Sequence, residues 1–443
     1  MSKRTTPRNQ AIFLASTFVA GAVAGAFVWG FFKLMNAGLS FLWDTLPAIL
    51  APLIAQAIPG MGKGAFDFLP FPLIVCLIGG LVIGLYEKHV GFAPEELPQV
   101  IGSVKKNGRY PYDHLGKRSL AALLPLLFGG SVGPEAGLTG VIAGLCTWVG
   151  DRMRALGADI RLMTVTGTQA ALTAIFAAPL YGFAAPLTND PDNNEGGAGD
   201  SPQATSRKQK ALVYFVAVAG ALGAFVVLGD LLGQGGGLPR FEEAHVGTTE
   251  LAWLVPLALT GTLCGWFYLT ANALTEKLSK AMKSHPVAKA VLAGGILGGI
   301  GCFLPYTMFA GEHQAKLLME AYLGIPAVVL IATAFAKAVV TPLCINLGWK
   351  GGHFFPLIFC GVSLGYGIAI ATGADAVFCV AICTAAVMGA VMRNVVMTTL
   401  LLVMCFPLKG VVAMMCAAFI ASIIPLPRAL KPHKDETYER MEQ

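Results

Sequence analysis

Long apolar segments recur along almost the whole chain, and they restrict the folds that it can adopt more than any other feature. A helix needs about 20 apolar residues to cross the hydrocarbon core of a bilayer. Segments that approach or reach this length include residues 11–32, 71–86, 211–232, 251–269 and 288–304. A transmembrane β-barrel would instead show short segments in which apolar and polar residues alternate. We therefore predict an all-α protein that crosses a membrane many times.

The composition agrees with a membrane protein. Only 13% of the 443 residues are charged and 55% are hydrophobic, whereas soluble domains carry about 25% charged residues. The net charge is +6, but the basic residues lie at the ends of apolar segments, where cytoplasmic loops place them. We therefore expect the lipid bilayer as surroundings and no nucleic acid as a partner.

The ten cysteines lie mostly inside apolar segments and lack the paired spacing of disulfides or metal sites. We interpret them as small buried hydrophobic residues. The histidines also lack zinc-type spacing, and no nucleophile motif is present. We therefore expect no metal site and no enzyme activity.

One clearly polar stretch divides the chain into two membrane halves. Positively charged residues near the start are typical of a cytoplasmic tail before a first span, and the polar stretch has the composition of a flexible loop. The predicted units are a cytoplasmic N-terminal tail (1–10), a first membrane half (11–187), a flexible polar loop (188–210), a second membrane half (211–427) and a short C-terminal tail (428–443).

A glycine-rich segment at residues 129–137, with the sequence GGSVGPEAG, separates two apolar segments. Pro134 suits the first turn of a helix, and Gly133 allows the backbone to approach a ligand closely. Several backbone N–H groups from Ser131 onward would then be unpaired at the positive end of a helix, in apolar surroundings. Such a helix end can bind an anion.

The second half contains a segment of the same design, residues 351–356, with the sequence GGHFFP before another apolar stretch. Broken helices at matching places in two halves indicate a binding site near the middle of the membrane. We therefore expect the N–H groups near Val132 and Gly133 to meet those near His353 and Phe354 around one anion. His353 could make binding sensitive to pH, or its backbone alone could matter.

Three motifs resemble those of the CLC chloride channel and transporter family, in the same order. Residues 91–95, 130–134 and 352–356 resemble Gly-Ser-Gly-Ile-Pro, Gly-Lys/Arg-Glu-Gly-Pro and Gly-x-Phe-x-Pro, respectively. The resemblance implies an inverted-repeat fold with broken and re-entrant helices, and a homodimer with one pathway per subunit. It also implies a small inorganic anion such as chloride as the transported ligand, no cofactor, and the inner (plasma) membrane of a bacterium.

The chain departs from the family's motifs at four positions, as expected of a divergent bacterial-type member that lacks the gating glutamate. That glutamate aligns with Val132, and the inner proton-transfer glutamate of the exchangers aligns with Asn189. The motif serine that binds the central anion aligns with Gly91. The family's coordinating tyrosine has no clear match in this sequence, and Tyr438 is only a weak candidate.

Our first hypothesis is a passive, chloride-type anion channel. Val132 can neither compete with an anion nor bind a proton, so the outer site would stay open. The anion would be held mainly by backbone amides, which bind weakly enough to let it leave.

The alternative is a proton-coupled antiporter of chloride or fluoride that uses a relocated carboxylate. Glu135 lies one helical turn after Val132, and carboxylates inside membranes are functional candidates. The competing interpretation is that Glu135 only stabilises the positive end of its own helix.

Overall fold

The computed structural model describes residues 7–57, 71–91, 94–95, 97–153, 160–176, 207–233, 237–242 and 244–425. These residues are almost entirely helical, and the one β-type pairing among them is an isolated bridge between Gly133 and Gly352. Seven of the described helices are long and apolar enough to cross a membrane. The predicted all-helical, multi-pass architecture is therefore confirmed.

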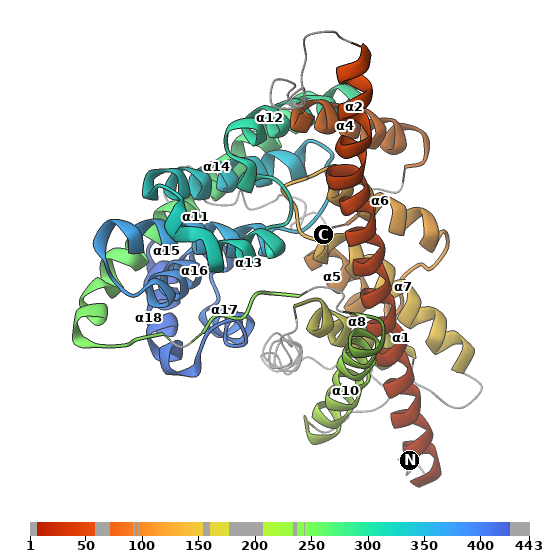
Figure 1. The fold of residues 1–443 in the computed structure, drawn as a ribbon. Coiled ribbons are helices and arrows are strands. Elements are labelled where there is room, and N and C mark those ends of the chain that lie inside the picture. Colours follow the sequence, from red (N-terminus) through yellow and green to blue (C-terminus); the bar gives the residue numbers. More distant parts are fainter. Residues whose placement is uncertain are drawn as a thin grey trace.

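The helices are named in chain order, as in Figure 1. They are α1 (Pro7–Ser40), α2 (Leu46–Ala57), α4 (Phe71–His89), α5 (Leu97–Asn107), α6 (Leu115–Leu127), α7 (Glu135–Met153), α8 (Ile160–Phe176), α10 (Arg207–Leu232), α11 (Thr248–Ala281), α12 (Pro286–Phe303), α13 (Glu312–Ala321), α14 (Ala327–Asn346), α15 (Phe354–Thr372), α16 (Ala376–Met392), α17 (Val395–Leu402) and α18 (Val411–Ile423).

Helices of the first predicted half pack against helices of the second. Helix α10 lies beside α1 and α8, whereas α4 lies beside α12 (Figure 1). The remaining late helices, α11 and α13 to α18, form their own group around α15 and α16. Helix α15 is the most enclosed of the seven candidate spans, since 83% of its apolar window is buried inside the protein.

The first span is longer than the sequence indicated. Residues 46–58 are rich in proline, which usually ends a helix, but α1 continues through a π-helical turn, Phe41–Thr45, into α2. In this turn the N–H of Leu46 donates to the carbonyl of Phe41, five residues back. The wider turn allows the chain to continue as helix, although Pro52 lies inside α2.

The polar loop predicted at residues 188–210 ends earlier than the sequence indicated. Helix α10 begins at Arg207, so the last four residues of the predicted loop are helical. Lysine, arginine and glutamine are good helix formers, and the basic residues therefore extend the apolar helix instead of ending it. Residues 188–206 lie outside the described residues.

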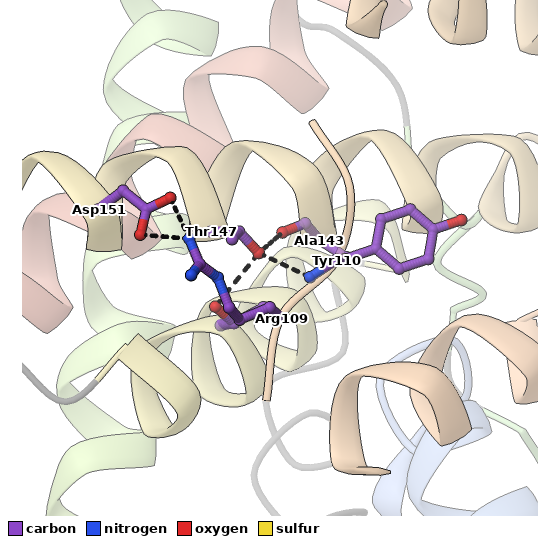
Figure 2. A network of polar contacts seen from close by, with 6 residues as sticks. Arg109, Tyr110, Ala143, Thr147 and Asp151 are labelled. Carbon is purple, nitrogen blue, oxygen red and sulfur yellow. Dashed lines mark hydrogen bonds and ion pairs between the residues drawn. The ribbon is translucent and has the colours of Figure 1, made fainter. Parts of the chain in front are cut away.

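Polar contacts hold the short loop between α5 and α6 against one face of α7 (Figure 2). The N–H of Tyr110 donates to Thr147 Oγ1 at 3.0 Å, and the Thr147 hydroxyl donates to the carbonyl of Ala143 at 2.8 Å. Arg109 pairs with Asp151 at 2.6 Å. The acceptors are spaced four residues apart on α7, so the loop runs along that helix and positions α6, which leads to residues 129–133.

Glycines allow α4 and α12 to lie close together. A Cβ atom on Gly294 would collide with the carbonyl oxygen of Cys76, and one on Gly298 would lie 2.6 Å from the Cα of Leu73. On the opposite face of α12, a Cβ on Gly299 would meet nothing within 4 Å. Small residues are what allow two helix backbones to approach in a membrane.

This packing predicts that Gly294→Ala destabilises the protein by about 1–3 kcal/mol, because α4 and α12 must separate to admit a methyl group. The matched control is Gly299→Ala, which should leave stability unchanged or raise it by about 0.5–1 kcal/mol, since alanine favours a helix. Thermal unfolding of the detergent-solubilised protein, followed by tryptophan fluorescence, measures both. Equal unfolding midpoints for the two variants would contradict the packing described here.

Candidate functional site

The glycine-rich segments before α7 and α15 meet at the centre of the protein. The N–H of Gly133 donates to the carbonyl of Gly352, and the N–H of Gly352 donates to the carbonyl of Gly133, both at 2.7 Å. This pair of hydrogen bonds joins two segments that are separated by more than 200 residues of sequence. The N-terminal ends of the two helices therefore converge, as the motif spacing predicted.

Glu135, the first residue of α7, reaches across this junction to the start of α15. Its Oε1 atom accepts a hydrogen bond from the backbone N–H of Phe354 at 2.7 Å, and the residue is fully buried. The amides of Phe355 and of Glu135 itself also face the carboxyl group. The side chain thus places a carboxylate where an anion would meet the positive end of α15.

The two bridging glycines make room for this carboxylate. A Cβ atom on Gly133 would collide with the Glu135 carboxyl group, and so would a Cβ on Gly352. Neither glycine is among the residues with positive φ. Close approach of a charged group, rather than an unusual backbone conformation, is therefore the reason for glycine at both positions.

The two oxygens of the Glu135 carboxylate differ in their hydrogen bonding. Glu135 Oε2 is buried and has no hydrogen-bond partner in the part of the chain that the structure describes, which is unfavourable for a polar atom in apolar surroundings. The carboxylate therefore meets the start of α15 through Oε1.

Ser131 and Val132 belong to the segment that leads into α7, and both side chains make buried contacts. The hydroxyls of Ser131 and Thr341 are hydrogen-bonded at 3.0 Å. Val132 is fully buried and packs against Gly351, where an added Cβ would lie 2.6 Å from a Val132 methyl group. Neither side chain brings an ionisable group to the site.

Aromatic rings enclose the site on the side of α15. The imidazole of His353 lies 4.7 Å from the Phe354 ring and 5.9 Å from the ring of Tyr268 on α11. The ring of Phe176, at the end of α8, meets Phe354 edge-on at 5.6 Å and stacks on Phe355 at 5.5 Å. The rings of Phe176, Phe354 and Phe355 are buried, and in such surroundings electrostatic interactions are stronger than in water.

Two of the four amides expected to hold an anion are occupied in this structure. The Gly133 amide bonds the Gly352 carbonyl, and the Phe354 amide bonds Glu135. The expectation of free N–H groups at these two positions is therefore wrong. Sequence patterns show which amides a helix start leaves unpaired, but they do not show which distant groups will pair with them.

The residues expected from the first motif lie elsewhere. Gly91 ends α4 with φ +72°, a common conformation for the glycine that follows a helix, and it is exposed. Pro94 lines a small pocket with Glu87 and Lys350. The structure does not bring Gly91 to the junction of α7 and α15. Asn189 and Tyr438 lie outside the described residues.

Lys337 and Glu312 were not singled out as site residues from the sequence. Lys337 is fully buried inside the span formed by α14, and a lysine within residues 327–346 was the available signal. Glu312 begins α13 and is half-buried. The amide of Gly237 faces its carboxyl group, and its Oε2 atom has no hydrogen-bond partner among the described residues.

Metal ligands do not cluster in the part of the chain that the structure describes. All ten cysteines are free, and eight of them are buried. Arg393, which follows α16, donates to the carbonyl of Ile424 at the end of α18 at 2.7 Å. Its contact is with a helix end, as expected for a structural residue.

Comparison with known proteins shows similarity in sequence and in fold. A sequence model for the family described as voltage gated chloride channel matches residues 75–188 and 201–425. Chloride channel protein CLC-e of Arabidopsis thaliana is 24% identical over 392 residues, which cover 83% of this chain and 51% of that protein. The chain therefore spans about half the length of this curated relative.

Two solved structures share the fold. One is described as a slow cyanobacterial Cl⁻/H⁺ antiporter, with a TM-score of 0.72 and 17% identity over 99% of this chain and 100% of the other. The second is described as a CLC-type fluoride/proton antiporter, with a TM-score of 0.67 and 18% identity over 94% and 95% of the chains. The predicted CLC-like fold is thereby confirmed.

The geometry predicts that an inorganic anion replaces the carboxylate when Glu135 is changed to alanine. The Phe354 amide would lose its partner, and the cavity left between Gly133 and Gly352 would face the positive end of α15. Crystals of this variant grown in bromide should show an anomalous scattering peak within hydrogen-bond distance of Phe354 N. Glu320→Ala, which removes an exposed carboxylate on α13, should show none. An empty site in Glu135→Ala would contradict the prediction.

Proposed function

The chain belongs to the voltage gated chloride channel family, and we propose that it exchanges a small inorganic anion for protons across a membrane. The observation that carries this proposal is the hydrogen bond from Phe354 N to the buried Glu135 carboxylate. Further support comes from the two solved structures with the same fold, since both are described as antiporters.

Glu135 can couple the two ions because it competes with the anion for the same amides. While it is ionised, its carboxylate occupies the start of α15 and keeps another anion away. Protonation removes the negative charge, weakens the hydrogen bond from Phe354 and frees the helix end for the anion. For exchange, Glu135 takes up its proton from the side toward which the anion leaves and releases it to the side from which the anion entered. The ionised side chain then returns to the start of α15.

The other residues of the site would then support this exchange. Gly133 and Gly352 leave space for either the carboxylate or the anion. Ser131 and Val132 shape the wall on the side of α7, and the rings of His353 and Phe354 shape the opposite wall. Asn189 aligns with the inner proton-transfer glutamate of the family's exchangers, and we further propose that it contributes at the inner end of the pathway.

A passive channel is the second candidate, and Val132 is the observation that favours it. The motif position of the family's gating glutamate holds a buried residue that cannot bind a proton. The channel hypothesis expects an open outer site, however, whereas Glu135 fills the start of α15. For this reason the antiporter is now the better supported of the two hypotheses.

The remaining proposals concern the ion and the assembly. Backbone amides bind chloride and fluoride through the same kind of hydrogen bond, so we propose a halide as the substrate. As in the family, we propose a homodimer in a lipid bilayer with a separate anion pathway in each subunit. The exposed apolar residues along the spans are suited to contact either lipid or a second subunit.

The decisive experiment uses the purified protein in liposomes. An outward chloride gradient, and in parallel a fluoride gradient, should drive protons into the liposomes against their own gradient if the ions are exchanged. Anion efflux that discharges the membrane voltage without proton movement would support the channel instead. Absence of any anion flux in either arm would contradict both hypotheses.

Replacing Glu135 tests the proposed mechanism. In Glu135→Gln, anion flux should continue while proton movement is lost, because the amide side chain cannot release or bind the coupled proton. Flux through the wild type should rise as the pH falls, by at most about tenfold per pH unit for a single proton, and the variant should lose this dependence. The matched control, Glu320→Gln on the exposed face of α13, should behave like the wild type. Unchanged proton coupling in Glu135→Gln would assign the coupling to another group.

A further inference from the structure

Lys337 is a charged residue buried in the middle of a membrane span, and neither the fold nor the proposed role of Glu135 accounts for it. The residue is fully buried on α14, and no acid lies within ion-pair distance of it in the described part of the chain. A charge inside a membrane protein is unfavourable unless it is compensated, and such residues are usually functional.

Backbone carbonyls compensate the charge. The Nζ atom of Lys337 donates to the carbonyls of Phe309, Met308 and Thr307 at 2.8, 3.0 and 3.1 Å, and it lies 3.4 Å from that of Tyr306. A lysine ammonium has three N–H donors and no acceptor, which matches the three short contacts. A neutral amine would direct its lone pair at one of these oxygens, so the geometry is that of the charged form.

Two hydrogen bonds link the surroundings of Lys337 to residues 129–131, which precede α7. The turn that surrounds its ammonium continues at Phe309, whose N–H donates to the carbonyl of Gly129 at 2.9 Å. One helical turn further along α14, the hydroxyl of Thr341 is bonded to that of Ser131 at 3.0 Å. The positive charge therefore lies behind residues 129–131, which lead directly into the junction of α7 and α15.

We propose that Lys337 is the buried positive charge that raises the affinity of the site at α7 and α15 for anions. Its carbonyl partners have no net charge, so the ammonium still acts as a positive charge on its surroundings. At a separation on the order of 10 Å and an effective dielectric constant of about 20, a unit charge changes a binding constant about tenfold. This inference rests on the proposed anion transport but not on proton coupling.

Three substitutions at Lys337 separate the charge from its hydrogen bonds. Lys337→Arg keeps the charge, Lys337→Gln keeps N–H donors without charge, and Lys337→Met keeps neither. The half-saturating chloride concentration, measured by efflux from liposomes and by calorimetric titration with potassium chloride, should stay near the wild-type value in the arginine variant. It should rise about tenfold in the glutamine and methionine variants. Lys316→Gln, which removes an exposed lysine on α13, should leave it unchanged.

A second position tests the same charge without removing the lysine. Thr333 lies one turn before Lys337 on α14, is buried, and its hydroxyl has no hydrogen-bond partner among the residues that the structure describes. Thr333→Asp would place a carboxylate on the same helix face and neutralise the ammonium by an ion pair. It should raise the half-saturating chloride concentration about tenfold, whereas the isosteric, neutral Thr333→Asn should not. This pair remains informative if Lys337→Gln fails to fold.

The outcomes distinguish this inference from the proposed function. If the wild type transports anions but glutamine and arginine at position 337 give equal affinities, or Thr333→Asp and Thr333→Asn do, Lys337 acts only as a structural donor and the inference is overturned. If the wild type transports neither chloride nor fluoride, the proposed function itself fails. Loss of proton coupling in Glu135→Gln does not depend on the affinities measured for the variants at positions 333 and 337.

Discussion

Two hydrogen bonds between Gly133 and Gly352 fix the N-terminal ends of α7 and α15 against each other. Each helix end carries unpaired N–H groups and a partial positive charge. Bringing two such ends together in an apolar interior is unfavourable unless a negative charge lies between them. The carboxylate of Glu135 supplies that charge, and the absence of side chains on the two glycines leaves the space for it.

Backbone groups, rather than ion pairs, compensate the buried charges at the centre of the protein. Glu135 is held by an amide at the start of α15, and Lys337 is held by carbonyls of the turn at residues 306–309. A direct salt bridge between them would neutralise both charges and leave little electrostatic influence on a transported ion. Compensation by dipoles satisfies each group and preserves its net charge, which suits a site that must attract one ion and release another.

The position of the carboxylate affects how such a site would work. Val132 lies in the segment before α7 and packs into the protein, whereas Glu135 begins the helix and extends toward α15. The start of α15 can therefore be occupied from the side of α7 even though the motif position is apolar. An anion that binds at the start of α15 would first have to displace this side chain.

The lengths of the apolar segments and the glycines and prolines of the motifs were sufficient to predict much of the fold. The spans, the helix starts at residues 135 and 354 and the convergence of two glycine-rich segments follow from local rules about hydrophobicity, proline and glycine. The continuous first helix was missed because a π-helical turn at Phe41–Thr45 offsets the prolines that follow.

Only the tertiary structure decided what the central groups contact. Glu135 was compatible with two roles in the sequence, and its partner Phe354 lies 219 residues away. Lys337 gave no pattern beyond one lysine in an apolar segment, and its partners come from a turn about 30 residues earlier. Local sequence determines which groups are left unpaired, but packing determines which groups meet, because hydrogen bonds in the interior depend on positions that distant segments adopt together.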